Sequence, residues 1–261
     1  MTRQAVLRQL ADGVLAGDAA AIGRALTFVE NQLPGAHELL AALLAAKPAA
    51  AGQAHRVGIT GAPGAGKSSF IGALLAHLAP LDKRIAVLAV DPSSPISGGA
   101  VLGDRLRFGT AAAAANVFVR SMAARTSLGG LNAAIGDALA VLDAAGFELI
   151  LIETVGAGQS EVEIMKVAQS VLVLCPPGLG DEVQALKAGI LEIAHILVVS
   201  KGDLPAAASV AHDLADSLRL RKKSGWPIPI VTVSSLNGQG IAEVAESLAR
   251  HRQYCRGQQL A

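Results

Sequence analysis

Hydrophobic residues recur along this chain with two different periods, and the change falls near residue 53. Before it, apolar positions repeat at i, i+3, i+4 and i+7 in three stretches, which is the spacing of an amphipathic helix. These stretches are residues 5–15, 20–31 and 37–46. The pattern predicts an N-terminal helical extension over residues 1–52, which ends in an alanine-rich linker.

From residue 53 onward, short runs of apolar and β-branched residues alternate with amphipathic segments. Runs that are apolar on both faces are typical of strands in a parallel sheet covered by helices. Six runs have this character, at residues 57–60, 85–91, 147–154, 170–176, 195–201 and 228–234, and 117–121 is a candidate seventh. The sequence predicts an α/β domain over 53–261 with a mostly parallel sheet and helices on both faces. Ligands of such sheets bind beyond the carboxyl ends of the strands.

The first run leads into GAPGAGKSS, which fits the phosphate-loop (Walker A) pattern G-x-x-x-x-G-K-[ST]. Glycine lets such a loop bring backbone N–H groups close to phosphate oxygens, and the helix that follows aims its positive end at them. Lys67 is expected to reach the outer phosphates as a catalytic residue, and the Ser68 hydroxyl to bind magnesium. A strand precedes the loop and a helix follows it, so the sequence predicts the fold of a P-loop NTPase. The predicted nucleotide-binding residues here are Gly61, Ala62, Pro63, Gly64, Ala65, Gly66, Lys67, Ser68 and Ser69.

Acidic residues follow two other predicted strands. Asp91 ends the second run, Asp104 lies in the glycine-rich stretch after it, and Glu153 ends the run at 147–154. A carboxylate in these places can hold magnesium beside Ser68. Asp91 and Glu153 are therefore candidate catalytic residues, and all three are candidate metal ligands. The alternative for Asp91 is that it caps a turn, since Asp-Pro-Ser is ordinary turn chemistry.

Two further strand ends resemble the base-binding elements of GTPases. Ser200, Lys201 and Asp203 resemble the N-K-x-D guanine reader, with serine in place of asparagine. Ser234, Ser235 and Leu236 resemble the S-A-L loop that faces the guanine carbonyl. The alternative is a strand-end turn followed by an ordinary helix cap.

Composition excludes several classes of partner. The net charge is +1 and aromatic residues make up only 3 %, so there is no electrostatic footprint for nucleic acid and little to stack bases on. No apolar run is long enough to span a bilayer. The two cysteines, Cys175 and Cys255, are far apart in the sequence and suggest no disulfide framework. These features predict a cytoplasmic protein with no nucleic-acid or membrane partner.

Taken together, the motifs resemble one family, the MeaB/ArgK-type P-loop GTPases, which act as chaperones of cobalamin-dependent acyl-CoA mutases. The resemblance covers roughly residues 56–240 and also the N-terminal helices. Its most specific stretches are ETVGAGQSE at 153–161 and GDEVQALKAG at 180–189.

The resemblance implies a slow GTPase that binds GTP and Mg²⁺ and is stimulated by a client such as methylmalonyl-CoA mutase. Lys67 and Ser68 match the family's phosphate lysine and magnesium hydroxyl, and its acidic magnesium-shell residues match Asp91, Asp104 and Glu153. The segment around Asp181, Glu182 and Lys187 matches a mobile loop that reports the nucleotide state to the mutase. Two departures carry expectations of their own. Ser200 predicts weaker guanine binding, and an end at Ala261 predicts a monomer or weak homodimer.

Other functions remain open at this point. A metal-insertion GTPase for a nickel enzyme would need clustered His or Cys ligands, and the six histidines are scattered in sequence. A P-loop small-molecule kinase would need an acceptor-binding lid. A nucleotide-binding protein without turnover is the third alternative.

Overall fold

Seven parallel strands form the centre of the molecule. The computed structural model describes residues 2–46, 54–91, 108–123, 130–154, 166–178, 192–219 and 225–259. Within these ranges the strand order is β3-β2-β4-β1-β5-β6-β7, and every neighbouring pair is parallel. The strands are β1 (His55–Gly61), β2 (Ile85–Asp91), β3 (Val117–Ala123), β4 (Leu149–Thr154), β5 (Ser170–Cys175), β6 (Ile196–Val199) and β7 (Ile230–Thr232). The six predicted strands and the candidate seventh are confirmed.

Helices cover both faces of this sheet, as the continuous apolar runs predict. On one face, strand side chains pack against α4 (Lys67–Leu78) and α10 (Ile241–Gln259). On the other face they pack against α6 (Gly130–Ala144) and α9 (Ala207–Arg219). Among the described residues, no helix combines the length and the apolar character needed to cross a bilayer.

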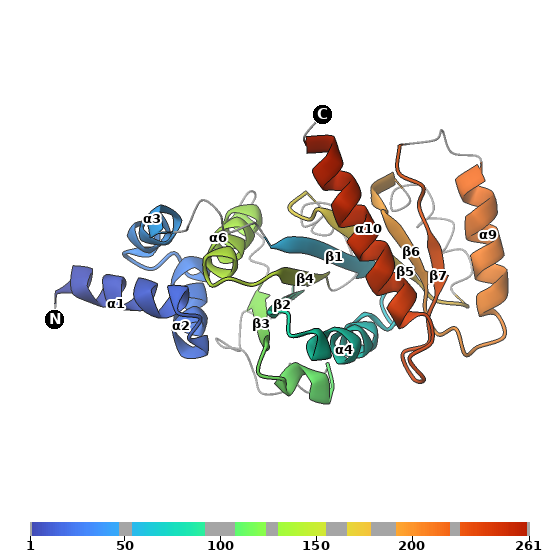
Figure 1. Cartoon of the computed structure of the whole chain (residues 1–261), viewed down its shortest axis with the longest axis horizontal. Helices are drawn as coiled ribbons and strands as arrows, with labels where there is room; N and C mark the ends of the chain where they lie inside the picture. The colour runs from blue at the N-terminus through green and yellow to red at the C-terminus, as the bar shows by residue number, and fades with distance from the viewer. Residues whose placement is uncertain are drawn as a thin grey trace.

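The three predicted N-terminal helices are present as α1 (Arg3–Leu15), α2 (Ala19–Glu30) and α3 (Ala36–Ala46). They lie at the opposite end of the molecule from α9 (Figure 1). Their buried side chains join the same hydrophobic core as α6, so the helices extend the sheet's own core. The predicted boundary at 52/53 falls between residues 47 and 53, outside the described residues, and stays a prediction.

Two arginines of the sheet region hold these helices in place. Arg84 donates to the Ala145 carbonyl at 2.5 Å and to the Gly17 carbonyl, between α1 and α2, at 3.4 Å. Arg120 of β3 pairs with Glu30 of α2 at 2.9 Å, and the two side chains are only 14 % and 12 % exposed. A partly buried charge pair of this kind ties one element to the other, because removing either partner leaves a poorly solvated charge.

Candidate functional site

The phosphate loop connects the central strand β1 to α4 at the carboxyl edge of the sheet. Its first glycine, Gly61, has φ 146°, and a Cβ there would lie 2.5 Å from the Leu174 carbonyl oxygen of β5. Gly66 caps α4 with φ 85°. Glycine is therefore required at both positions, at Gly61 by the neighbouring strand and at Gly66 by the left-handed backbone. A glycine-rich loop that leads directly into the first turn of a helix is the arrangement in which backbone N–H groups bind anions.

Lys67 lies inside this loop. Its side chain is buried, and its Nζ donates to the carbonyl oxygens of Gly61 at 2.7 Å and Ala62 at 3.2 Å. The ammonium group is thus held beside the loop amides that would face phosphate, where its charge can act on the same anion.

Ser68 and Glu153 come together from two different elements. The Ser68 hydroxyl donates to Glu153 Oε1 at 2.7 Å, and Glu153 is only 2 % exposed. Glu153 lies near the end of β4, which is paired with β1. Two of the four predicted metal ligands therefore present oxygen atoms side by side, which is the donor chemistry that Mg²⁺ prefers.

The remaining predicted acidic residues are less fully described. Asp91 ends β2, next to β4, and is paired with Ala123 of β3. Its side chain lies outside the described residues, as do the whole of Asp104, Asp181, Glu182 and Lys187.

On the other side of the phosphate loop, the ends of β6 and β7 bring the predicted base-binding residues together. Ser234 is fully buried, and its hydroxyl donates to Asp203 Oδ1 at 2.7 Å. Ser200 is also buried, but its hydroxyl donates to the Ala65 carbonyl of the phosphate loop at 2.8 Å. Asp203 is thus oriented by a serine of the neighbouring loop, while Ser200 faces the phosphate end.

The other predicted base-binding residues lie at the surface of the same edge. Lys201 is exposed and has φ 54°, a left-handed conformation that is uncommon outside glycine. Leu236 is 87 % exposed, and Ser235 is partly buried beside it. The backbone of this region is fixed by a hydrogen bond from Gly202 N to the Val233 carbonyl at 2.8 Å.

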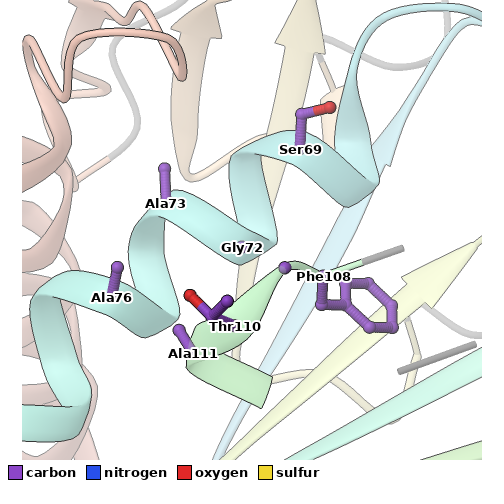
Figure 2. A pocket seen from close by; sticks show the side chains of 8 residues that line it. Ser69, Gly72, Ala73, Ala76, Phe108, Thr110 and Ala111 are labelled. Atoms are coloured by element: carbon purple, nitrogen blue, oxygen red, sulfur yellow. The ribbon is translucent and has the colours of Figure 1, made fainter. Parts of the chain in front are cut away.

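A hollow of about 330 Å³ runs along α4, starting at Ser69 of the phosphate loop. Figure 2 shows Ser69, Ala73 and Ala76 along one side of the helix, with Thr110 and Ala111 near them. Small side chains at these positions let residues 108–111 approach the helix closely. The closest approach is at Gly72, where an added Cβ would lie 2.7 Å from the Phe108 carbonyl oxygen.

Replacing Gly72 with alanine should therefore destabilise the protein, although alanine is the better helix former. The new methyl group would press on a backbone carbonyl, and overpacking of this kind costs about 1–3 kcal/mol. Gly136→Ala on α6 is the matched control, since a Cβ there meets no described atom within 4 Å; it should stabilise the protein by about 0.5–1 kcal/mol. Urea denaturation measures both. A shift of both variants in the same direction would show that contact with Phe108 does not matter.

A second polar cluster lies at the opposite, amino edge of the sheet. His55 opens β1, Ser170 opens β5 and His251 lies on α10. The Ser170 hydroxyl is within 2.7 Å of His55 Nε2 and 2.7 Å of His251 Nδ1. One hydroxyl has one proton to donate, so one imidazole donates to Ser170 and the other accepts from it. The ring of His195 lies 4.2 Å from that of His251.

The imidazoles of His55 and His251 are held in the neutral form. Burial, followed by the nearby charge of Arg252, lowers the pKa of His55 to about 3. Burial, followed by the proximity of His195, lowers the pKa of His251 to about 4. No group of three or more metal-ligating side chains was found within the described ranges.

Sequence reasoning treated these histidines as scattered and missed the cluster. A signal was present, because His55 and Ser170 begin neighbouring strands and His195 directly precedes β6. The starts of parallel strands meet at one edge, just as their ends do.

Comparisons with known proteins give matches over most of the chain. The profile of a family described as "Methylmalonyl Co-A mutase-associated GTPase MeaB" matches residues 22–260. A Pyrococcus horikoshii protein classed by name among the GTPases is 42 % identical over 94 % of this chain and 78 % of its own length. The Escherichia coli GTPase ArgK is 34 % identical over 94 % of this chain and 75 % of its own. The crystal structure of a LAO/AO transport system kinase is similar with a TM-score of 0.74 and 26 % identity, covering 100 % of this chain and 83 % of that one.

Proposed function

The chain belongs to the MeaB family of GTPases, and on that premise we propose that it assembles or protects a cobalamin-dependent acyl-CoA mutase. The family description names methylmalonyl-CoA mutase as the protein with which such GTPases associate. A mutase of that class is therefore the proposed client, and GTP hydrolysis is the step that would time its loading or protection.

The observation that carries the nucleotide half of this proposal is the partly buried hydrogen bond between Ser68 and Glu153 at the end of the phosphate loop. A hydroxyl and a carboxylate oxygen in contact are suited to Mg²⁺, which favours oxygen ligands. We propose that Ser68 and Glu153 hold Mg²⁺ together with Asp91 and Asp104. The ion would neutralise charge on the outer phosphates of GTP.

The chain's own groups have distinct roles in this proposal. The N–H groups of the phosphate loop bind the phosphates, and Lys67 adds a full positive charge beside them. At the other end, Asp203 accepts hydrogen bonds from the N–H groups of guanine, oriented by Ser234 at 2.7 Å. Lys201 and Leu236 are both exposed and would cover the base.

The test is to mix the protein with purified cobalamin-dependent acyl-CoA mutase from the same organism. We expect a complex by light scattering and faster GTP turnover than the protein shows alone, because a partner that binds one nucleotide-bound conformation better stabilises that conformation. The same mixture made with the Lys67→Ala protein is the control, since it separates turnover by this chain from turnover by contaminants.

The two halves of the proposal can fail separately. GTP turnover by the protein alone, with no complex and no stimulation by any acyl-CoA mutase of that organism, would remove the chaperone role and leave a GTPase with another client. Stimulation by an unrelated enzyme to the same extent would show that the effect is not specific to mutases.

A further inference from the structure

We infer that Ser200 positions an amide of the phosphate loop instead of reading the base of the nucleotide. The inference rests on the proposed nucleotide site. Its starting point is the hydrogen bond from the Ser200 hydroxyl to the Ala65 carbonyl at 2.8 Å, which joins positions 135 residues apart. Ser200 is 3 % exposed and Ala65 is 0 % exposed, so neither group can exchange this bond for one with water.

The peptide bond after Ala65 links this hydrogen bond to the phosphate site. Among the described residues no peptide bond is cis, and a trans peptide is planar, with its C=O and N–H pointing in opposite directions. A donor that holds the Ala65 oxygen therefore fixes the direction of the Gly66 N–H. Gly66 caps α4 with φ 85°, and its N–H belongs to the loop amides that would face phosphate.

The position of Ser200 is itself fixed by the sheet. Its backbone N–H donates to the Cys175 carbonyl of β5 at 3.2 Å, and β5 lies next to β1, which carries the loop. A short side chain at this strand end can reach the loop carbonyl from a fixed backbone. Ser200 thereby pre-orders the Gly66 amide without touching the nucleotide, and acts as a positioning residue.

A second buried serine shows the contrast. Ser234 donates to Asp203 at 2.7 Å, so its hydroxyl acts on the base end, whereas that of Ser200 acts on the phosphate end. The two serines are a matched pair, because both are buried and both donate a single short hydrogen bond. Their alanine variants should have different consequences for the same set of ligands.

The experiment measures the affinities of GDP, ADP and inorganic pyrophosphate by competition against a fluorescent guanine nucleotide. Ser200→Ala should weaken all three by the same factor, roughly three- to tenfold for one lost hydrogen bond, and should leave the ratio of GDP to ADP affinity unchanged. Ser234→Ala should instead lower the ratio of GDP to ADP affinity and leave pyrophosphate affinity unchanged.

A second variant guards against a merely structural effect. Ser200→Thr keeps the hydroxyl donor, so it should restore pyrophosphate affinity; binding no tighter than that of Ser200→Ala would overturn the inference. So would a Ser200→Ala protein that loses guanine preference but binds pyrophosphate normally, since that result would make Ser200 a reader of the base. A wild-type protein that binds none of the three ligands would instead remove the nucleotide site itself.

Discussion

Lys67→Ala is expected to lose GTP hydrolysis, with turnover falling by at least about a hundredfold. The ammonium group of Lys67 is buried within the loop, 2.7 Å from the Gly61 carbonyl. Its charge would therefore act on phosphate in a site where water screens it little. The positive charge of Lys67 matters most while negative charge shifts on the outer phosphates during hydrolysis. The turnover rate should therefore fall by a larger factor than the nucleotide affinity. Phosphate release at saturating GTP, together with direct binding of GDP, separates the two effects.

The matched control is Lys83→Ala. Lys83 is exposed and lies just before β2, at the amino edge of the sheet, so its loss should leave turnover unchanged. Circular dichroism of both variants checks the fold. If the Lys67→Ala protein hydrolyses GTP at the wild-type rate, hydrolysis does not take place at this loop, and the assignment of the whole site is wrong.

The elements of the fold could be predicted because each is encoded locally. Three stretches with helical spacing form α1, α2 and α3, and the six apolar runs form strands of the sheet. The position of β4 between β2 and β1 is not encoded in any single segment of the sequence. It depends on how the connections between strands bury apolar surface in the whole domain.

Sequence motifs propose the members of the candidate site but not the contacts between them. Motif spacing places Ser68 at the start of the helix that follows β1 and Glu153 at the end of another strand, and in the structure the Ser68 hydroxyl lies 2.7 Å from Glu153 Oε1. The direction of the Ser200 hydroxyl was not predictable, because it depends on the separation between β6 and the loop. In the sequence, serine at a position where GTPases have asparagine suggests only that guanine is bound differently. The observed partner of Ser200 is the backbone carbonyl of Ala65, and no sequence motif identifies such a contact.

Contacts between distant elements were missed for the same reason. Arg84 and Arg120 look like ordinary surface residues in the sequence, yet they tie the N-terminal helices to the sheet. The His55–Ser170–His251 cluster joins residues that only the parallel arrangement of β1 and β5 and the path of α10 bring together. This cluster also predicts how the stability of the protein depends on pH, which the sequence motifs do not.

Stability is expected to fall steeply as the pH drops from about 6.5 to 5. The pKa of His55 is lowered to about 3 and that of His251 to about 4, so in this window the unfolded chain binds protons that the folded chain does not. Unfolding free energy therefore rises with pH here. Each histidine contributes a loss of about 2 kcal/mol by pH 5, about 4 kcal/mol for the pair. That is a large share of a typical domain stability of about 5–15 kcal/mol.

The charged and titratable groups named for these two rings disfavour a proton on them or stay neutral. Arg252 and Arg256 of α10 lower the pKa of His55, as does His251, and His195 lowers the pKa of His251. Cys255, 3.8 Å from the nitrogens of His251, has a pKa raised by burial and stays neutral. Within the described part of the chain, no carboxylate is among the groups that act on either ring, so these residues offer a proton on either imidazole no counter-charge.

Urea denaturation between pH 5 and 8 measures the effect. The double variant His55→Gln/His251→Gln keeps polar side chains but cannot titrate, so its unfolding free energy should change much less with pH than that of the wild type. His212→Gln is the control: this histidine of α9 has a side chain 75 % exposed and pairs with Asp216, and its loss should leave the slope unchanged. Equal slopes in the wild type and the double variant would mean that acid acts elsewhere and that these imidazoles do not hold α10 to the sheet through their neutral form.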